Sequence, residues 1–387
     1  MLGADESIFS EVSKDNQLLK RLALYLKILK QSDSNARIFV VIHTKKTQKE
    51  FSIDHDLFFI PIQSKLIQYY PFKTYKFLIN NISKFNPELI TCQNPFEIGL
   101  LGLMIKRKLH ISLEIQIHLN LFSKYWLNEH RINNRLRYFM AKAVLYNANR
   151  IRVVSSGIKK NLEESLKIDS SKIFIAPVPV LIQDYCNEST LEILSPNNKE
   201  KTVLYVGRLI HSKNMPGLLR LCKKVLKIVN NVQFIIIGDG PQKEFVVDEA
   251  RKIDPERIII LGSIPYSQLV NWYKRSDVFI LPSLHEGFSR VLVESYLFKL
   301  PAVATKCGGP QDIIIDGRTG FLTNIEDIDL FSEKIIWLLE HPYDAKAMGL
   351  EGYEFVLNQF NPAMLAQKIV SEWVQLLNNY EPNHDIS

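Results

Sequence analysis

Two carboxylates just after an apolar run are the residues best suited to chemistry in this sequence of 387 residues. Glu286 and Glu294 lie in the segment LPSLHEGFSRVLVESY, which begins at the end of the apolar run Val278 to Leu281. A strand, a glycine turn and then a helix would place Glu286 in the turn and Glu294 in the first turns of the helix. Both carboxylates would then lie at the carboxyl end of one strand.

The start of that helix also predicts a site for an anion. Its first N–H groups, near Phe288 to Val291, have no partner inside the helix and favour a negative charge. A pyrophosphate flanked by two carboxylates that accept hydrogen bonds from hydroxyl groups fits a nucleotide sugar. The alternative is that two acids at this spacing are surface charges on a capped helix, and the spacing alone leaves both interpretations open.

Other candidate residues are less specific. Gly308 and Gly309 follow the apolar run Ala302 to Thr305, where glycine would let the backbone approach a sugar, although an ordinary turn explains them nearly as well. His118 ends the apolar run 113–117, and a lone histidine at a strand end is more often structural or solvent-facing. The 4 cysteines are far apart and form no C-x-x-C pair, so they predict reduced thiols rather than disulfides or a zinc site.

Short apolar runs that alternate with amphipathic segments of helical length must position these residues. In the second half of the chain the runs FIII, IIIL and VFIL are continuously apolar, which is typical of buried parallel strands. Strands are expected at 203–206, 233–237, 257–261, 278–281 and 302–305, with helices near 213–228, 241–252, 266–275 and 291–298. This half therefore predicts a doubly wound α/β domain.

The first half repeats the pattern less clearly. Strands are expected at 37–42, 57–60, 89–91, 113–117, 151–154 and 172–175, with helices near 15–30, 71–84, 95–108, 131–147 and 156–167. A polar stretch, Asn187 to Lys201, is the best linker candidate. We expect two Rossmann-like lobes that face each other across a cleft, at 1–190 and 191–360, with a final helix in 361–387 that packs back toward the first lobe.

Composition and charge narrow the class of protein. Hydrophobic residues make up 46% and charged residues 23%, as in folded globular proteins. No apolar stretch approaches the roughly 18 residues needed to cross a bilayer, and the start lacks the pattern of a secretory signal, so a cytoplasmic protein is expected.

Residues 1–200 carry 28 Lys/Arg against 19 Asp/Glu, so the first lobe alone is basic. This indicates an anionic partner or, alternatively, an ordinary solvated basic face.

The motifs together resemble the donor site of the retaining glycosyltransferases of family four, which have the two-lobed GT-B fold. The central match is Glu286-Gly287-Phe288 followed after five residues by Glu294. Segments that agree in order and spacing are Val206 to Leu209 with Lys213 and Asn214, Ile237 to Pro241, Leu261-Gly262, Asp277-Val278, Pro282-Ser283, Pro301, Gly308-Gly309 and Ile315 to Gly320. The first lobe matches more loosely, through Gln116 to His118 and Val153 to Ser155.

The resemblance implies a role for each matching residue. Arg208 and Lys213 would grip the donor diphosphate, because a guanidinium binds phosphate with two prongs and an ammonium acts as a point charge. Glu294 would accept hydrogen bonds from the ribose hydroxyls, and Glu286 would lie against the sugar. Further contacts are implied for His118 near the transferred sugar, Gly287, Phe288 and Ser289 at the phosphate or sugar, Gly262 and Ile264 beside the base, and Gly308 and Gly309 near the sugar. With two cations on the diphosphate, neither a metal ion nor another cofactor is expected.

The chain departs from the family pattern in two places. Members usually begin with a hydrophobic strand and a glycine-bearing loop, whereas this sequence begins MLGADES. The first strand of the first lobe is therefore expected to be truncated and the centre of the sheet poorly filled. Ser289 and Arg290 occupy positions where glycine and an uncharged residue are frequent. Ser289 can still offer N–H and hydroxyl groups to an anion, whereas Arg290 either adds charge there or points to solvent.

The expected function is transfer of a hexose-type sugar, with retention, from a nucleoside diphosphate sugar to a saccharide or lipid-linked acceptor. Such a reaction would serve the synthesis of a cell-surface polysaccharide or glycolipid. Two alternatives stay open: a GT-B-like sugar-nucleotide epimerase, which would need acid and base carboxylates from both lobes, and a non-catalytic partner subunit that keeps the fold.

The basic first lobe also predicts a peripheral contact with an anionic membrane on its cytoplasmic face. Arg131, Arg135 and Lys142 recur at helical spacing. An apolar and aromatic cluster lies just upstream and consists of Leu121, Phe122, Tyr125 and Trp126. A nucleic-acid partner is not expected, because the basic lobe contains no recognisable reading module.

Overall fold

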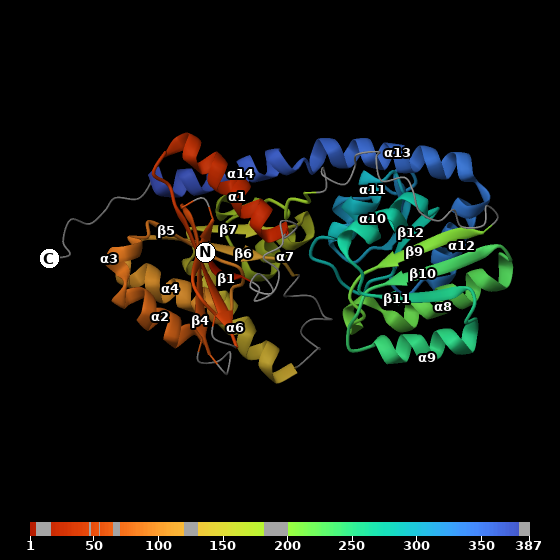
Figure 1. Ribbon diagram of the computed structural model, residues 1–387, viewed down its shortest axis with the longest axis horizontal. Helices are drawn as coiled ribbons and strands as arrows, with labels where there is room; N and C mark the ends of the chain where they lie inside the picture. Colours follow the sequence, from red (N-terminus) through yellow and green to blue (C-terminus); the bar gives the residue numbers. More distant parts are fainter. Residues whose placement is uncertain are drawn as a thin grey trace. The chain divides into compact units, whose positions relative to one another are not determined.

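The computed structural model describes residues 1–4, 17–45, 48–53, 55–64, 70–119, 131–181 and 200–378. The chain forms two compact units, Met1–Leu181 with Pro362–Ser387, and Ile182–Asn361 (Figure 1). Each unit contains a largely parallel sheet covered by helices, so the predicted α/β class with two Rossmann-like lobes is confirmed. The expected linker at 187–201 and the aromatic cluster at 121–126 lie outside the described residues, apart from 200 and 201.

The sheet of the second unit has six parallel strands in the order β11-β10-β9-β12-β13-β14. The strands are β9 (Lys201–Val206), β10 (Val232–Ile237), β11 (Ile258–Gly262), β12 (Val278–Leu281), β13 (Ala302–Thr305) and β14 (Gly320–Thr323). The five predicted strands are confirmed within two residues. Their apolar runs are largely buried in β9, β10, β12 and β13, whereas the edge strand β11 is half-buried along most of its length. The strand β14 was not predicted.

An apolar core that includes alternate strand residues such as Val203 and Tyr205 lies on one face of this sheet, and helices cover both faces. They are α8 (Met215–Ile228), α9 (Lys243–Ile253), α10 (Tyr266–Arg275), α11 (Arg290–Leu297), α12 (Ile328–Glu340) and α13 (Pro342–Gln359). The apolar stripe of α8 lies on β9 and β10, where Tyr205 and Phe234 are almost fully buried.

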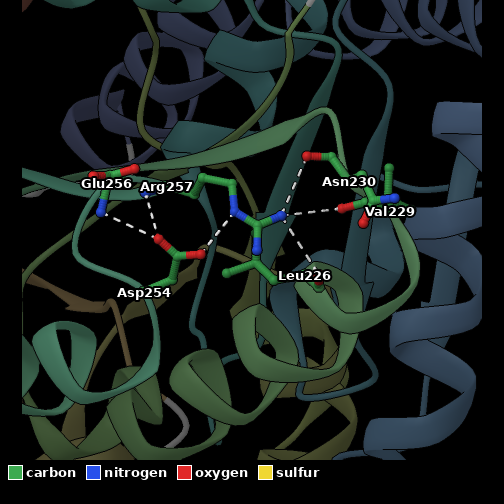
Figure 2. A network of polar contacts seen from close by, with 6 residues as sticks. All are labelled: Leu226, Val229, Asn230, Asp254, Glu256 and Arg257. Carbon is green, nitrogen blue, oxygen red and sulfur yellow. Dashed lines mark hydrogen bonds and ion pairs between the residues drawn. The ribbon is translucent and has the colours of Figure 1, made fainter.

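A single arginine fastens the end of α8 to the start of β11 (Figure 2). The guanidinium of Arg257 donates to the carboxylate of Asp254 at 2.7 Å and to the carbonyls of Val229 and Asn230 at 3.4 and 3.3 Å. A further, longer contact reaches the Leu226 carbonyl. Because the last carbonyls of a helix have no partner inside the helix, a cation at this end is stabilising.

The sheet of the first unit has eight strands in the order β3-β4-β2-β1-β5-β6-β7-β8, of which only β3 is antiparallel to its neighbour. They are β1 (Leu2–Ala4), β2 (Ile38–Thr44), β3 (Phe51–Ile53), β4 (Leu57–Gln63), β5 (Leu89–Cys92), β6 (Ser112–Ile117), β7 (Arg150–Val153) and β8 (Ile173–Ile175). The six predicted strands are present. The short strand β1 lies where a truncated first strand was expected, and β3 was not predicted.

The strand β1 is only three residues long, although it lies at the centre of the sheet between β2 and β5. Leu2 pairs with Val41 on one side and with Cys92 on the other. Next to it lies a cavity of about 360 Å³ lined by side chains that include Met1, Phe39 and Ile90. Leu2 itself is almost fully buried between its two neighbouring strands.

The helices of the first unit are α1 (Gln17–Ser32), α2 (Tyr70–Asn80), α3 (Ile82–Phe85), α4 (Glu97–Leu109), α6 (Arg131–Asn147), α7 (Ser156–Leu166) and the C-terminal α14 (Pro362–Asn378). The helix α14 packs on α1, where the rings of Tyr25 and Trp373 meet edge to face at 5.5 Å. Its Trp373 Nε1 donates to the fully buried carboxylate of Glu114 in β6 at 2.9 Å. Among the described residues, no helix is both long enough and apolar enough to span a bilayer.

The Arg257 contacts predict a measurable contribution to stability. Arg257→Met should lower the free energy of unfolding by about 1.5 kcal/mol, because charge-assisted bonds to Asp254 and to the end of α8 are lost. Urea unfolding measures this. The control is Arg251→Met, whose guanidinium is 71% exposed and makes one long ion pair with Asp248, so it should change stability by under about 0.5 kcal/mol. Equal losses in the two variants would contradict the role of Arg257.

Candidate functional site

The predicted donor-site residues follow the strands of the second unit at their carboxyl ends. From β9 the chain continues to β10 and β11 on one side, and it later returns to β12, which pairs with the other side of β9. The order of the strands therefore reverses between β9 and β12, and open α/β sheets bind ligands in the crevice at such a switch point. Lys213 follows β9 and Glu286 follows β12, so the two residues come from opposite sides of the switch point.

An ion pair between Lys213 and Glu286 joins the two loops. The Lys213 Nζ donates to Glu286 Oε1, and the side chains are only 19% and 7% exposed. The hydroxyl of Ser283 donates to the same carboxylate oxygen at 2.8 Å. Glu286 Oε2 has no hydrogen-bond partner among the described residues, and an ammonium has three donor hydrogens. Both groups therefore keep hydrogen-bonding capacity for a ligand.

Backbone contacts hold these two loops independently of the ion pair. The N–H of Leu284 donates to the carbonyl of Ser212 at 2.9 Å. On the other side of Lys213, Asn214 has a left-handed backbone with φ of 59° and its side chain accepts from the N–H of Gly217 at 3.1 Å, which caps α8. The position of Lys213 is thus fixed by a short turn and a helix cap.

The glycines at 308 and 309 pack the loop after β13 against the loop of Glu286. The N–H of Glu286 donates to Cys307 and the N–H of Gly309 donates back to Glu286, both at 3.1 Å. A Cβ at Gly309 would lie 2.7 Å from the Phe288 Cα, and Gly308 has a φ of 115°. The structure therefore requires glycine here for the contact between the two loops; the predicted approach to a sugar is an additional role that the geometry allows.

Glu294 lies in α11 and is held by a buried tyrosine. The Tyr273 hydroxyl, from α10, donates to Glu294 Oε2 at 2.9 Å, and Glu294 is 8% exposed. Burial raises the pKa of Glu294, and the positive charge of Arg290 and the bond from Tyr273 oppose that rise. Tyr273 was missed from the sequence, because it lies on the apolar face of a helix where an aromatic residue indicates only core packing. Arg290 itself is exposed.

The start of α11 carries unpaired donors directly after Glu286. Ser289 is the N-cap residue, and its hydroxyl is buried without a hydrogen-bond partner among the described residues. Within the same part of the structure, the backbone N–H groups of Arg290 and Val291 have no acceptor. Gly287 is buried and Phe288 packs at 5.4 Å from the ring of Phe360. These unpaired donors lie where the sequence predicts an anion site, and binding of an anion there stays a prediction.

The remaining candidate residues lie at the same edge of the sheet. Arg208, like Lys213, follows β9, whereas Gly262 and Ile264 lie at the carboxyl end of β11. Arg208 follows β9, and its exposed guanidinium has no hydrogen bond or ion pair to the described residues. Gly262 ends β11 with a φ of 69°, and its carbonyl accepts from the N–H of Gly238 at 2.9 Å; Ile264 is half-buried. In the part of the chain that the structure describes, no three His, Cys, Asp or Glu side chains could hold a metal ion.

His118 belongs to the first unit and directly follows β6. Burial and the positive charges of Arg152 and Arg21 lower its pKa to about 3, so the imidazole is neutral at physiological pH. A neutral imidazole can donate one hydrogen bond and accept another. Its predicted place near the transferred sugar stays a prediction.

Comparison with known proteins and family models shows the family to which this chain belongs. Residues 187–355 match the model described as Glycosyl transferases group 1, and residues 30–182 match the model described as Glycosyltransferase Family 4. The chain is 28% identical over 179 residues to 2-deoxystreptamine N-acetyl-D-glucosaminyltransferase of Niallia circulans, which is 46% of this chain and 45% of that protein. It is 23% identical over 254 residues to the capsular polysaccharide biosynthesis glycosyltransferase CapM of Staphylococcus aureus, which is 65% of this chain and 62% of that protein. The matches thus span less than two thirds of either relative.

Solved structures show the same fold. Sucrose-phosphate synthase from Thermosynechococcus elongatus superposes with a TM-score of 0.82 at 18% identity, over 98% of this chain and 99% of that one. HepE from Anabaena, solved in complex with UDP-glucose, superposes with a TM-score of 0.71 at 16% identity, over 97% and 98% of the two chains. Two Rossmann-like units of this kind define the GT-B class of glycosyltransferase folds. The chain belongs to the family-four glycosyltransferases.

The bond from Tyr273 predicts a pH-dependent loss of stability. Tyr273→Phe should lower the free energy of unfolding at neutral pH by about 2 kcal/mol, because a buried carboxylate loses its donor. This loss of stability should shrink as the pH falls through the raised pKa of Glu294, since burial of a protonated carboxyl costs less free energy than burial of a carboxylate.

Urea unfolding of both proteins across that pH range measures this change. The control is Tyr343→Phe. Because the Tyr343 side chain is 89% exposed, this change should leave the free energy of unfolding unaltered at every pH. A loss that is the same at every pH would show that packing, rather than the hydrogen bond, holds Glu294.

Proposed function

We propose that this protein is a retaining glycosyltransferase that moves a hexose-type sugar from a nucleoside diphosphate sugar to an acceptor hydroxyl. The observation that carries the proposal is the buried Lys213–Glu286 pair at the switch point of the second unit. It combines a cation for the diphosphate with a carboxylate for the sugar, and the N-terminus of α11 follows it directly in the chain.

The two cations after β9 would bind the donor diphosphate in different ways. Arg208 has a free, exposed guanidinium, which suits two-pronged binding of phosphate oxygens. Lys213 uses one donor hydrogen for Glu286 and has two left for phosphate. The departing diphosphate gains negative charge in the transition state, so cations fixed in advance lower the barrier.

The two carboxylates would orient hydroxyl groups. Glu286 Oε2 is free to accept from a sugar hydroxyl while Oε1 stays bound to Ser283 and Lys213. Glu294 Oε2 accepts from Tyr273, which leaves Oε1 for the ribose. Because Glu286 is tied to a lysine and a serine, we assign it to binding and electrostatic stabilisation rather than to nucleophilic attack.

The reaction would need no protein nucleophile. The acceptor oxygen forms the new bond to the anomeric carbon while the bond to the phosphate oxygen breaks, on the same face of the sugar. The departing phosphate oxygen takes the acceptor proton. The neutral imidazole of His118 would donate a hydrogen bond to a hydroxyl of the transferred sugar.

The similar proteins support a saccharide as the acceptor and a uridine nucleotide as the first donor to test. One relative is named for capsular polysaccharide biosynthesis, and the HepE structure was solved with UDP-glucose. We propose that this chain acts in the synthesis of a cell-surface polysaccharide or glycolipid. We expect no metal ion or other cofactor in the reaction, since two cations serve the diphosphate.

Incubation with a panel of radiolabelled nucleotide sugars and saccharide or lipid-linked acceptors tests the proposal. Transfer is expected, and the anomeric configuration of the product, read by NMR, should equal that of the donor. A freely released epimer of the donor, or binding without transfer to any acceptor, would support the epimerase or the non-catalytic subunit instead.

Calorimetry with UDP and with uridine isolates the contribution of the cations. Arg208→Met and Lys213→Met should each weaken UDP binding about tenfold or more, because a charge-assisted bond to phosphate is lost, and they should leave the weaker uridine binding unchanged. Lys224→Met is the matched control, because Lys224 also pairs with an acid, Asp329, outside the site. Unchanged UDP binding by Lys213→Met would contradict the assignment.

A further inference from the structure

The helix α6 of the first unit displays a second apolar stripe on its outward face. Its inward face is made by buried residues that include Ala141, Val144 and Leu145. On the opposite face, Leu136 is 64% exposed and Phe139 is 66% exposed. Tyr146 follows them at helical spacing, and its hydroxyl donates to the carbonyl of Leu166 in α7. Ordinary surface helices are polar on this side, so the stripe calls for a partner.

Basic side chains flank the stripe. Arg135 and Lys142 are exposed on α6 next to Phe139, and Lys142 Nζ lies 5.9 Å from the ring centroid of Tyr146. A helix with apolar side chains at its outer pole and lysine or arginine beside them is typical of segments that lie in a membrane interface.

The neighbouring helix α4 extends this surface. The helices α4 and α6 pack together, and the Arg137 guanidinium donates to Glu97 Oε1 at 3.2 Å between them. The connections β5 to β6 and β6 to β7 run in the same direction along the sheet, so right-handed crossovers place both helices on one face of it. The exposed side chains of α4 are of the same two kinds, Leu100 and Met104 with Arg107 and Lys108. We call these residues together with Arg135, Leu136, Phe139, Lys142 and Tyr146 the α4–α6 face.

The charge around the α4–α6 face has one sign. Described residues 70–119 and 131–147 contain ten Lys/Arg and three Asp/Glu. Of the acids, Glu97 is paired with Arg137 and Glu114 is fully buried. Within α4 and α6 alone there are seven Lys/Arg and one Asp/Glu, so these two helices carry a net positive charge.

We propose that the α4–α6 face docks on an anionic bilayer surface. Leu136 and Phe139 enter the headgroup region, and Arg135, Lys142, Arg107 and Lys108 contact lipid phosphates. The positive charge favours a bilayer over a second copy of the chain as the partner. A symmetric dimer interface would bring two positively charged faces together, and they would repel each other. The inference goes beyond the proposed function, since docking requires neither donor binding nor turnover.

Vesicle flotation of the full chain tests the proposal. Binding to mixed phosphatidylcholine–phosphatidylglycerol vesicles should exceed binding to pure phosphatidylcholine about tenfold or more, and should fall at high salt. The double variants Leu136→Ser with Phe139→Ser, and Arg135→Glu with Lys142→Glu, should each reduce binding to the anionic vesicles about tenfold or more. These side chains are exposed, so the fold should be preserved.

Matched controls lie in the second unit. Ile228→Ser removes an apolar side chain that is 64% exposed, and Arg251→Glu reverses a charge that is 71% exposed; neither should change vesicle binding. UDP calorimetry on every variant separates this test from the donor site, because docking variants should bind UDP as the unmodified chain does.

Two results would overturn the proposal. The first is equal binding to both kinds of vesicle, or binding that the face variants leave unchanged. The second is a dimer in vesicle-free solution that Leu136→Ser with Phe139→Ser converts to a monomer, as seen by analytical ultracentrifugation. That result would assign the α4–α6 face to a contact between copies of the chain.

Discussion

A lysine and a glutamate from two sides of one switch point are the contact on which the candidate site depends. The ion pair of Lys213 and Glu286 is largely buried, and a buried charge is stable only when it is paired or hydrogen-bonded. The pair joins the loops after β9 and β12, which backbone contacts also hold, and it leaves one carboxylate oxygen and two ammonium hydrogens unused. A nucleoside diphosphate sugar supplies both an anion and hydroxyl groups, which match those unused positions.

The remainder of the second unit supports this geometry through its backbone. Glycines at 308 and 309 let the loop after β13 touch the Glu286 loop, where any side chain would collide. At Gly238 a Cβ would lie 1.9 Å from the carbonyl of Gly207, so the loops after β9 and β10 also need glycine to pack. Tyr273 holds Glu294 from the core side. The positions of the polar groups thus follow from the packing beneath them, which prepares the site before a ligand binds.

The sequence predicted the parts of the fold that a continuous apolar run can specify. Strands such as Val278–Leu281 and Ala302–Thr305 are buried on both faces and coincide with the prediction. The missed strands β3 (FSI) and β14 (GFLT) are similarly short but are not continuous apolar runs. Spacing and resemblance selected Lys213, Glu286 and Glu294 individually. They could not predict that Lys213 pairs with Glu286, or that Tyr273 reaches Glu294, because both contacts join elements that are distant in the sequence.

The central claim is that Lys213 exchanges part of its contact with Glu286 for the diphosphate of an activated sugar. A crystal structure of the protein with an intact nucleoside diphosphate sugar tests this most directly. We expect the Lys213 ammonium within hydrogen-bond distance of a diphosphate oxygen and a sugar hydroxyl on Glu286 Oε2. A bound donor whose diphosphate contacts neither Lys213 nor Arg208, with the Lys213–Glu286 pair unchanged, would contradict the account.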